Sequence, residues 1–185
     1  MLYFHIEALL FYQGEVLHLE NTNLESQLRQ LSKNRLPLWH EFPDFELYMD
    51  QLVSLGNRYL KNLQGTEITA SMVNSYVKKG LMHRPNKKKY DTANVAELVV
   101  ISLLKAIYSL ETIKKGLQSV AKNTQTDESY NYFAQLFNKT LAEIGDNSFS
   151  FKFDYQDDLI LLTEKFAVHA VIYKIIGEKM VSLQN

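Results

Sequence analysis

The sequence predicts an all-α fold of one domain, or of one small domain with an appendage. The chain has 185 residues, and 46% of them are apolar, which is enough to bury a substantial core. It holds three prolines and seven glycines, fewer than the many turns of an all-β fold require. Apolar residues recur at spacings of three and four in several long runs, and capping residues precede most of these runs.

The first segment, residues 1–22, is apolar and fits more than one structure. It could form two short strands around Gln13 and Gly14, or a single apolar helix. Either form would expose too much apolar surface to stand alone. We therefore expect it to pack on the C-terminal helix or on a second subunit, in preference to binding a ligand.

Two helices are predicted in the next part of the chain. An amphipathic helix begins near Asn23 and is stopped by Pro37. Trp39 lies in an apolar cluster between two prolines, where we expect it to anchor packing with its indole N–H bonded locally. Asp44 is expected to cap a second helix that runs to Leu63, because aspartate accepts hydrogen bonds from first-turn amides.

A short helix over residues 70–79 follows. Thr69 and Ser71 are both suitable N-caps, and Gly80 suits the left-handed position just past a helix end. The expected buried stripe consists of Met72, Val73, Tyr76 and Val77. The other faces present Asn74, Ser75, Lys78 and Lys79. This pattern predicts a helix that rests on one apolar stripe and shows polar groups elsewhere.

Residues 83–90 form a basic loop that contains one proline. From Thr66 to Thr92, six basic residues stand against two acidic ones, giving +4. The whole chain is −1, so the remainder sums to −5. A positive patch on an acidic body attracts polyanions locally, although a run of lysines also fits an ordinary solvated face.

A long helix is predicted from Thr92, with Asp91 as its cap. Its apolar stripe is wide enough to be the hydrophobic centre of the molecule. Ser109 is expected to cap the next helix. A polar linker at residues 123–126 then divides the predicted domain of residues 23–123 from a C-terminal region.

The C-terminal region, residues 124–185, is predicted to be helical. A helix over residues 127–144 precedes a segment around residues 149–153 in which phenylalanines alternate with polar residues, as in a short extended stretch. Asp157 and Asp158 are placed to cap the last helix. Its heptad seam consists of Leu159, Leu162, Phe166, His169, Tyr173, Ile176, Met180 and Leu183. Such a helix lies centrally in a bundle or is shared between two subunits.

Two stretches resemble known families. The run SMVNSYVKKGLM, followed by a basic loop ending at Tyr90, an apolar helix and then SLETI, resembles the MerR-type winged helix-turn-helix. The run LPLWHEFPDFELYMDQL, Leu36 to Leu52, together with KKKY, Lys87 to Tyr90, resembles a bacterial family known as a domain of unknown function. The resemblance implies a recognition helix at residues 70–79, with Asn74 in place of a basic contact, and a wing at residues 83–90.

The leading hypothesis is a DNA-binding transcriptional regulator. The predicted DNA-binding residues are Ser71, Asn74, Ser75, Lys78, Lys79, Arg84, Lys87, Lys88, Lys89 and Tyr90. The lysines would contact phosphates, whereas Asn74 and Ser71 could meet base edges. Double-stranded DNA is thus the expected partner, and the MerR resemblance implies a homodimer formed through the C-terminal helix. The alternative is a protein-interaction adaptor that keeps a helix-turn-helix fold without binding DNA.

A small-molecule effector is a further possibility, in a pocket lined by Phe133, Phe137 and Tyr173. Other chemistry is not expected. The chain has no cysteine, and its five histidines show no metal-ligand spacing. His169 fits a hydrogen-bonded core or interface position. We predict no enzyme activity, no catalytic residue, no cofactor and no metal site. No stretch has the length to cross a bilayer, and the first residues lack the features of a secretory signal, so the expected location is cytoplasmic.

Overall fold

The computed structural model of the chain describes residues 22–122, 124–146, 148 and 150–184. Apart from Thr22, the predicted N-terminal segment of residues 1–22 lies outside the described residues. The described part is helical and contains no strand, which confirms the all-α prediction. Its two isolated β-bridges, Leu47 with Tyr90 and Asn86 with Lys89, frame the basic loop.

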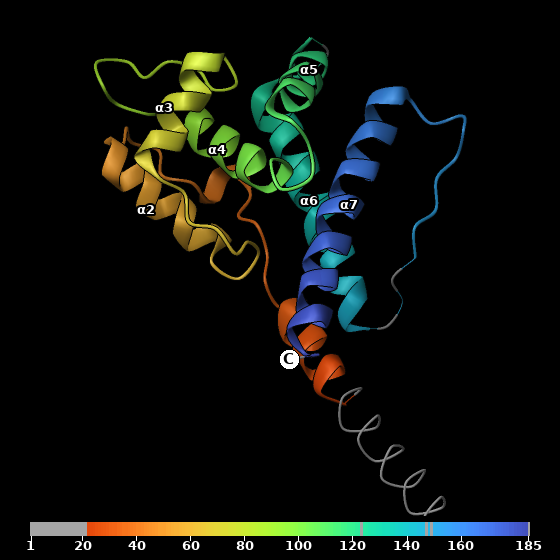
Figure 1. Cartoon of the computed structure of the whole chain (residues 1–185). Helices are drawn as coiled ribbons and strands as arrows, with labels where there is room; N and C mark the ends of the chain where they lie inside the picture. Colours follow the sequence, from red (N-terminus) through yellow and green to blue (C-terminus); the bar gives the residue numbers. More distant parts are fainter. Residues whose placement is uncertain (1–21, 123, 147, 149, 185) are drawn as a thin grey trace, which may run out of the picture.

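Residues 22–31 are helical, and seven further helical elements follow along the chain (Figure 1). They are the 3-10 turn η1 (Trp39–Glu41), α2 (Met49–Leu60), α3 (Ala70–Lys79), α4 (Thr92–Leu104), α5 (Leu110–Ala121), α6 (Thr126–Gly145) and α7 (Leu159–Ser182). In Figure 1, α2 and α3 lie on the left and α7 on the right, with α4, α5 and α6 between them. The described chain therefore places α3 and α7 on opposite sides.

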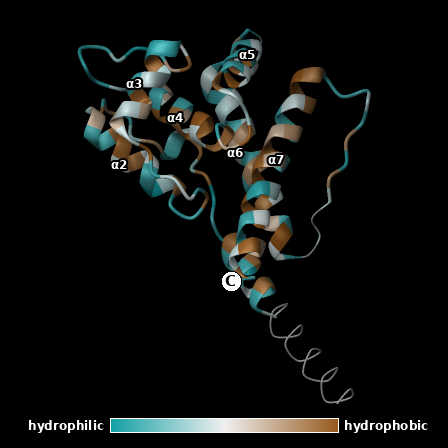
Figure 2. Ribbon diagram, in the orientation of Figure 1, coloured by the Kyte–Doolittle hydropathy of each residue, from teal (hydrophilic) through white to brown (hydrophobic). Residues whose placement is uncertain are grey.

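Helix α4 occupies the centre of this arrangement. Nine of its residues, from Asn94 to Leu103 without Glu97, are buried, and it packs against α2, α6 and α7. Figure 2 shows hydrophobic stretches along both α4 and α7. Asp91 caps α4 as predicted, because its carboxylate accepts from the Asn94 amide at 3.1 Å and the Asn94 side chain accepts from the Asp91 amide. The prediction that this helix is the hydrophobic centre is thus confirmed.

Helices α2 and α3 are joined by a turn that is fastened to α2. The Asn57 side chain on α2 accepts from Ile68 N at 2.7 Å and donates to Ile68 O at 2.9 Å. Next to it, a Cβ at Gly56 would lie 3.0 Å from Ile68 Cδ1 and 3.1 Å from a Leu98 methyl. Glycine at this position lets α2 approach both the turn and α4 closely. The start of α3 is thereby fixed relative to the core.

The segment before η1 is held by side chains of α6 instead of by a strand. Asn138 accepts from Leu36 N at 2.7 Å and donates to Leu36 O at 2.9 Å. Asn131 accepts from Trp39 N, and the Tyr130 hydroxyl donates to the Pro37 carbonyl, both at 2.8 Å. These contacts satisfy buried backbone groups that would otherwise lack partners.

Three aromatic side chains also meet beside this segment. Trp39 packs against Phe42 and Tyr130, with ring centroids 6.4 and 6.3 Å away, so its predicted packing role is confirmed. The side-chain acceptor found for Trp39 among the described residues, Asn131, receives its backbone N–H, and the predicted bond of the indole N–H stays a prediction. One continuous buried cluster runs from Leu31 through α4 and α6 to Ile175.

The predicted start of α2 at Asp44 is wrong. The helix begins at Met49 with Tyr48 as its N-cap, and residues 43–48 lead into the Leu47–Tyr90 bridge. Leu47 N donates to Tyr90 O at 2.7 Å, and Tyr90 N donates to Leu47 O at 2.8 Å. This pairing with a residue far along the chain outweighs the local capping preference of aspartate. Phe45 therefore remains 62% exposed instead of packing on a helix face.

Helix α7 buries one part of the predicted heptad seam, which includes His169, and leaves the other part exposed. Its buried residues are Ala167, Val168, His169, Val171, Ile172 and Ile175. Seam residues spaced seven apart remain at the surface: Leu159 is 76% exposed, and Phe166, Tyr173 and Met180 are 44%, 51% and 44% exposed. Asp158 caps the helix as predicted, accepting from Ile160 N at 2.8 Å. Of the predicted extended stretch, residues 149–153, the described residues 150–153 form no strand.

Glu164 on α7 is a half-buried carboxylate whose environment favours its neutral form. Burial raises its pKa to about 7 from an ordinary value of 4.5. The unfolded chain releases this proton near pH 4.5, whereas the folded chain keeps it until about pH 7. This group's contribution to stability is therefore complete below pH 4.5, is lost as the pH rises to about 7, and then stays level.

We predict that Glu164→Gln raises the free energy of unfolding at pH 8 by about 1–2 kcal/mol, a value discounted because the side chain is partly hydrated. At pH 4 the variant and the parent chain should be equally stable, since both side chains are then neutral. Urea titrations at the two pH values test this. Glu128→Gln, at an exposed position on α6, is the control and should change neither value. Equal stability of variant and parent at pH 8 would contradict the assignment.

Candidate nucleic-acid interface

The outer face of α3 is polar, exposed and aligned. Ser71, Asn74 and Lys78 are all exposed, and their spacing of three and four places them on one side of the helix. Thr69 caps the helix by accepting from Met72 N at 3.3 Å. Polar side chains are thus presented outward over about two turns of the helix, while Ser75 at the edge of this face is half-buried.

The inner face of α3 fixes which side points out. Val73 and Tyr76 are buried, and Met72 and Val77 pack partly against the same core, as the predicted stripe requires. Burial raises the pKa of Tyr76 to about 12, which reflects how little water reaches its phenol. Gly80 ends the helix with φ at +68°, and its N–H donates to carbonyls of the last turn, as predicted. Rotation of α3 is therefore set by the core.

The basic loop, residues 83–90, ends in a two-residue turn. Asn86 and Lys89 exchange backbone hydrogen bonds of 2.9 and 2.8 Å, and the two residues between them, Lys87 and Lys88, have φ of +46° and +67°. Positive φ at both central positions is the type I′ arrangement, which favours Asn-Gly because most side chains clash there. Lys87 and Lys88 therefore occupy positions in which a residue with a Cβ is strained.

The base of the loop is tied to the core on both sides. The Leu47–Tyr90 bridge holds one side. On the other, the Glu97 carboxylate on α4 accepts from His83 N at 3.0 Å and from the His83 ring Nδ1. Burial raises the pKa of Glu97, and the hydrogen bonds from His83 oppose this shift. Because its base is held at two points, the loop has a defined position, and its charged tip projects from the body of the protein (Figure 1).

Tyr90 differs from the other predicted site residues. It is 3% exposed, packs in the core, and burial raises the pKa of its hydroxyl. The remaining loop residues of the predicted set, Arg84, Lys87 and Lys88, are exposed, and Lys89 is half-exposed. Tyr90 therefore packs beneath the loop. The loop side chains that remain available to a partner are those of Arg84, Lys87, Lys88 and Lys89.

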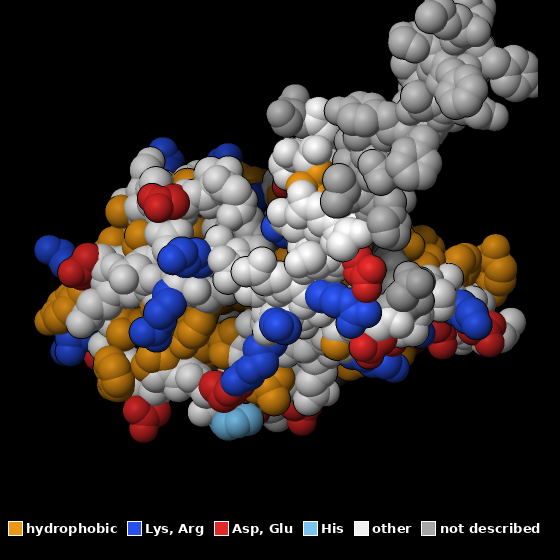
Figure 3. All heavy atoms as spheres, turned by 90° about the horizontal axis from the view of Figure 1, so that it is seen from below, with side chains coloured by type: hydrophobic (Ala, Val, Ile, Leu, Met, Phe, Trp, Pro, Cys, Tyr) orange, Lys and Arg blue, Asp and Glu red, His pale blue; other side chains and the backbone are white. Residues whose placement is uncertain are grey.

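The cations of α3 and the loop are largely unneutralised. Lys89 lies 3.4 Å from Glu46, which makes it the one member of the predicted set with a carboxylate partner among the described residues. The exposed ammonium and guanidinium groups are Lys78, Lys79, Arg84, Lys87 and Lys88. By contrast, basic and acidic side chains are interspersed on the face seen in Figure 3. The excess of positive charge is thus local to α3 and the loop.

Lys114 on α5 joins this set, although its position in the sequence gave no sign of it. Its Nζ donates to Lys79 O at 2.8 Å, beside Gly80. Together with Lys79 and Arg84 it borders a hollow of about 600 Å³ between α3, the loop, α5 and the first turn of α6. A lysine on the exposed side of a predicted helix is common, and only the packing of α5 against the end of α3 gives it this role.

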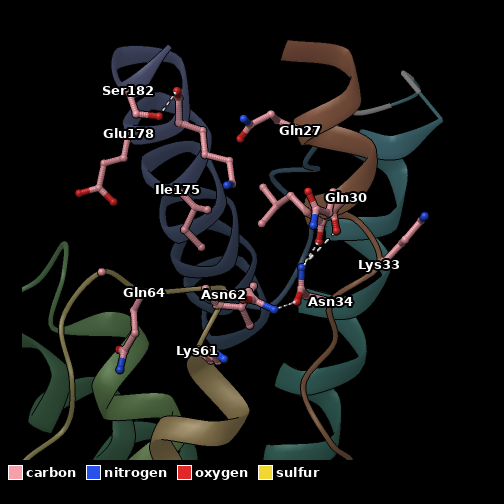
Figure 4. A pocket seen from close by; sticks show the side chains of 14 residues that line it. Gln27, Gln30, Lys33, Asn34, Lys61, Asn62, Gln64, Ile175, Glu178 and Ser182 are labelled. Carbon is pink, nitrogen blue, oxygen red and sulfur yellow. Dashed lines mark hydrogen bonds between the residues drawn. The ribbon is translucent and has the colours of Figure 1, made fainter. Parts of the chain in front are cut away.

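A second hollow lies on the far side of the turn between α2 and α3 (Figure 4). It has a volume of about 600 Å³ and is lined by residues 27–34, the turn itself and the end of α7. Asn62 donates to Asn34 Oδ1 at 2.8 Å, and Asn34 donates to Leu31 O at 2.8 Å. These amides bind one another and the backbone, so they join the N-terminal helical residues to the turn.

The part of the chain that is described holds neither a cluster of metal ligands nor a membrane-spanning helix. There, no group of three His, Asp or Glu side chains is placed to hold a metal ion. None of the helices in that part is long and apolar enough to cross a membrane. Of the predicted effector residues, Phe133 and Phe137 stack with ring centroids 6.5 Å apart, and Phe133 borders an apolar cavity. Phe137 is fully buried, and Tyr173 is half-exposed outside that cavity.

A family model described as a domain of unknown function, DUF1836, matches residues 37–140, more than half of the chain. The chain belongs to the DUF1836 family. The DUF1836 match begins at the segment held by α6 and ends within α6, so it includes both partners of that contact. It also includes α3, the basic loop and α4, and it crosses the predicted linker at residues 123–126. Neither the curated proteins nor the solved structures contain a match to this chain.

The turn at the loop tip leads to a prediction that distinguishes two effects on stability, backbone strain and charge repulsion. Replacing Lys87 with Asn and Lys88 with Gly places the favoured I′ pair in a backbone that already has positive φ. The free energy of unfolding should rise by about 1 kcal/mol, because each L-residue with a Cβ is strained in the left-handed region. Urea titration measures this change.

The matched control, Lys87→Ala with Lys88→Ala, removes the same two charges but keeps a Cβ at both positions. It should show little of the gain. If both double variants were equally stable, removal of repulsion between lysines, and not backbone strain, would account for the effect.

Proposed function

We propose that this DUF1836 protein binds double-stranded DNA through a winged helix-turn-helix formed by α2, α3 and the basic loop, and acts as a transcriptional regulator. In this proposal α3 enters the major groove and the loop is the wing, as the MerR resemblance implies. Two features support the proposal: α2 directly precedes α3, as in a helix-turn-helix, and the basic loop directly follows α3.

The observation that carries the proposal is the pair of lysines at the loop tip. Lys87 and Lys88 occupy left-handed positions that cost stability, although Asn or Gly would fold more easily there. Strained residues that persist at an exposed site point to a functional constraint. Two neighbouring ammonium groups held on a projecting turn suit contact with adjacent phosphates, which fix a protein's position on a duplex.

Sequence readout would come from α3. Asn74 is central on the exposed face, and a carboxamide can bond both the N6 and N7 groups of adenine. Ser71 lies one turn before it and Lys78 one turn after it, on the same side. Few base-reading groups on one helix give modest specificity, so two copies acting together would be needed for a defined operator.

The exposed stripe of α7 supports a homodimer. Leu159, Phe166, Tyr173 and Met180 recur every seven residues and are 44–76% exposed. Repeats of this kind match the a positions of a helix that packs against a second helix. Because α7 lies on the side away from α3, such a dimer leaves both recognition helices accessible (Figure 1).

A protein-interaction adaptor is the second candidate. The exposed aromatic residues Phe153 and Tyr155 precede α7, and Tyr155 is 85% exposed. Exposed apolar side chains that gather in one region mark interaction surfaces. If this candidate were correct, the α7 region would bind a partner and the lysines of the loop would have no measurable effect on DNA.

The first test is a fluorescent duplex titration over a range of salt concentrations. Lys87, Lys88 and Lys89 changed together to Ala should weaken binding to all sequences alike. The slope of log affinity against log salt should fall in magnitude by about 2–3, since each phosphate contact contributes about 0.9.

The control for this experiment removes three exposed lysines that lie outside α3 and the loop: Lys33, Lys122 and Lys152. It changes net charge equally and should leave the slope almost unchanged. A parent protein without measurable affinity at low salt, or equal effects of the two triple variants, would reject DNA binding by this loop.

The second test concerns selectivity. Asn74→Ala should retain non-specific affinity but lose about 1–3 kcal/mol of discrimination at one base pair, the amount a good bidentate contact supplies. Selection of duplexes from a random pool, followed by competition titrations, measures this loss. Asn23→Ala, at an exposed position outside α3 and the loop, is the control, and an unchanged preference in Asn74→Ala would remove Asn74 from base readout.

The third test is the oligomeric state. Phe166→Lys combined with Met180→Lys places charge in the α7 stripe and should convert a dimer of twice 21.5 kDa into a monomer in sedimentation experiments. Gln156→Lys, at an exposed position before the helix, should leave the dimer intact. A parent chain that sediments as a monomer at all concentrations would exclude this mode of assembly.

A further inference from the structure

A second candidate site lies at the C-terminal end of α4, whereas the basic loop leads into the N-terminal end of this helix. It is an apolar cavity of about 290 Å³ between the end of α4, α5 and the first turns of α7. This is roughly twice the ~150 Å³ of an apolar cavity that holds a benzene ring. Its apolar walls are Val100, Leu104, Ile113, Leu117, Val120, Phe133, Ile160 and Ala167.

Gly116 leaves the α5 wall of the cavity open. A Cβ built at this residue meets no atom within 4 Å, so the space beside the helix is unfilled. Glycine in the middle of a helix costs about 1 kcal/mol relative to alanine. Neither a turn nor a close helix contact requires glycine here, because its φ is not positive and no neighbour approaches it. Room for a ligand is the property that glycine provides at this position.

Glu164 brings a carboxylate into this apolar cavity. It lines the wall formed by α7, and the shift in its pKa arises from burial, without a compensating hydrogen bond or ion pair among the described residues. The described lining contains no lysine, arginine or histidine. A carboxylate in such surroundings is stabilised by a cation that brings a hydrogen-bond donor.

We propose that this cavity binds a small apolar amine, with the ammonium group paired to Glu164 and the hydrocarbon body in the space beside Gly116. An anionic ligand would meet the carboxylate with like charge, and a neutral hydrocarbon would leave it unpaired. The aromatic rings of Tyr108 and Phe133 line the same cavity and add favourable faces for a cation. This site is independent of the proposed DNA binding.

The pH dependence of binding should follow Glu164. The ionisable groups near it are Tyr108 on the cavity wall, Tyr132 on α6, and the pair of Lys165 and Asp157. The ion pair lowers the pKa of Asp157 and raises that of Lys165, and burial raises that of Tyr132, so these three keep their charge state between pH 6 and 8. Amine binding should therefore strengthen from pH 6 to 8 as Glu164 ionises.

The experiment titrates n-hexylamine, hexan-1-ol and hexanoate separately into the full chain at pH 8, followed by amide chemical shifts. Hexylamine should bind at least about tenfold more tightly than hexanol, since a bond to a charged group adds that much. Hexanoate should not bind. The largest shifts should fall on α5 around Gly116 and on the first turns of α7.

Two variants with different effects test the assignment. Glu164→Gln should remove the preference for amine over alcohol but keep alcohol binding, whereas Gly116→Leu should remove binding of both by filling the space. Leucine favours helix over glycine, so Gly116→Leu should fold and its thermal unfolding checks this. Glu128→Gln is the charge control and should bind like the parent.

Three results would overturn the proposal. The first is equal affinity of the parent chain for hexylamine and hexanol. The second is unchanged amine affinity in folded Gly116→Leu. The third is that the amide shifts fall outside α4, α5 and α7, or that millimolar amine causes no shift at all.

Discussion

The structure depends on one constraint, the burial of α4 on every side. A helix that is apolar all round cannot have a solvent face, so each neighbour must cover part of it. Helices α2, α6 and α7 do so, and Asn94 and Ser102 are the polar residues buried in the helix itself. Asn94 and Asp91 exchange hydrogen bonds at the start of the helix, so the polar groups of Asn94 have partners although the residue is buried. The arrangement of the other described helices follows from this requirement.

The burial of α4 also fixes the position of the surface near α3. Because α2 lies directly on α4 through Gly56, the turn that starts α3 is fixed, and the buried stripe of α3 then sets its rotation. The basic loop is held by Leu47 on one side and Glu97 on the other. Rigid placement of this kind matters for recognition, because contacts with a regular polymer need side chains at fixed separations.

Local features of the sequence predicted the helix ends well. Thr69, Asp91, Ser109 and Asp158 cap helices as expected, and Gly80 ends α3, because these N-cap bonds join residues only two or three positions apart. Contacts between distant segments could not be predicted in this way. Asp44 loses its capping role to a bridge that involves the far side of the basic loop.

The candidate site was predictable to a similar extent. The polar face of α3 follows from helical spacing, so Ser71 and Asn74 could be placed from the sequence. The I′ turn could not, because Lys-Lys has no tendency to form it and the closure by Asn86 and Lys89 decides the backbone. Tyr90 was expected to contact DNA because the MerR resemblance places it in the wing, yet its pairing with Leu47 turns it into the core.

The amide groups of Asn131 and Asn138 take the place of a neighbouring strand. Extended segments usually satisfy their backbone by joining a sheet, and a sheet leaves an outer strand whose unpaired groups can template the addition of another molecule. Here Leu36 and Trp39 are satisfied by side chains from a helix. In residues 22–122 and 124–146 the structure has no strand, and the backbone of this segment is paired with α6 side chains instead of being open to the addition of another chain.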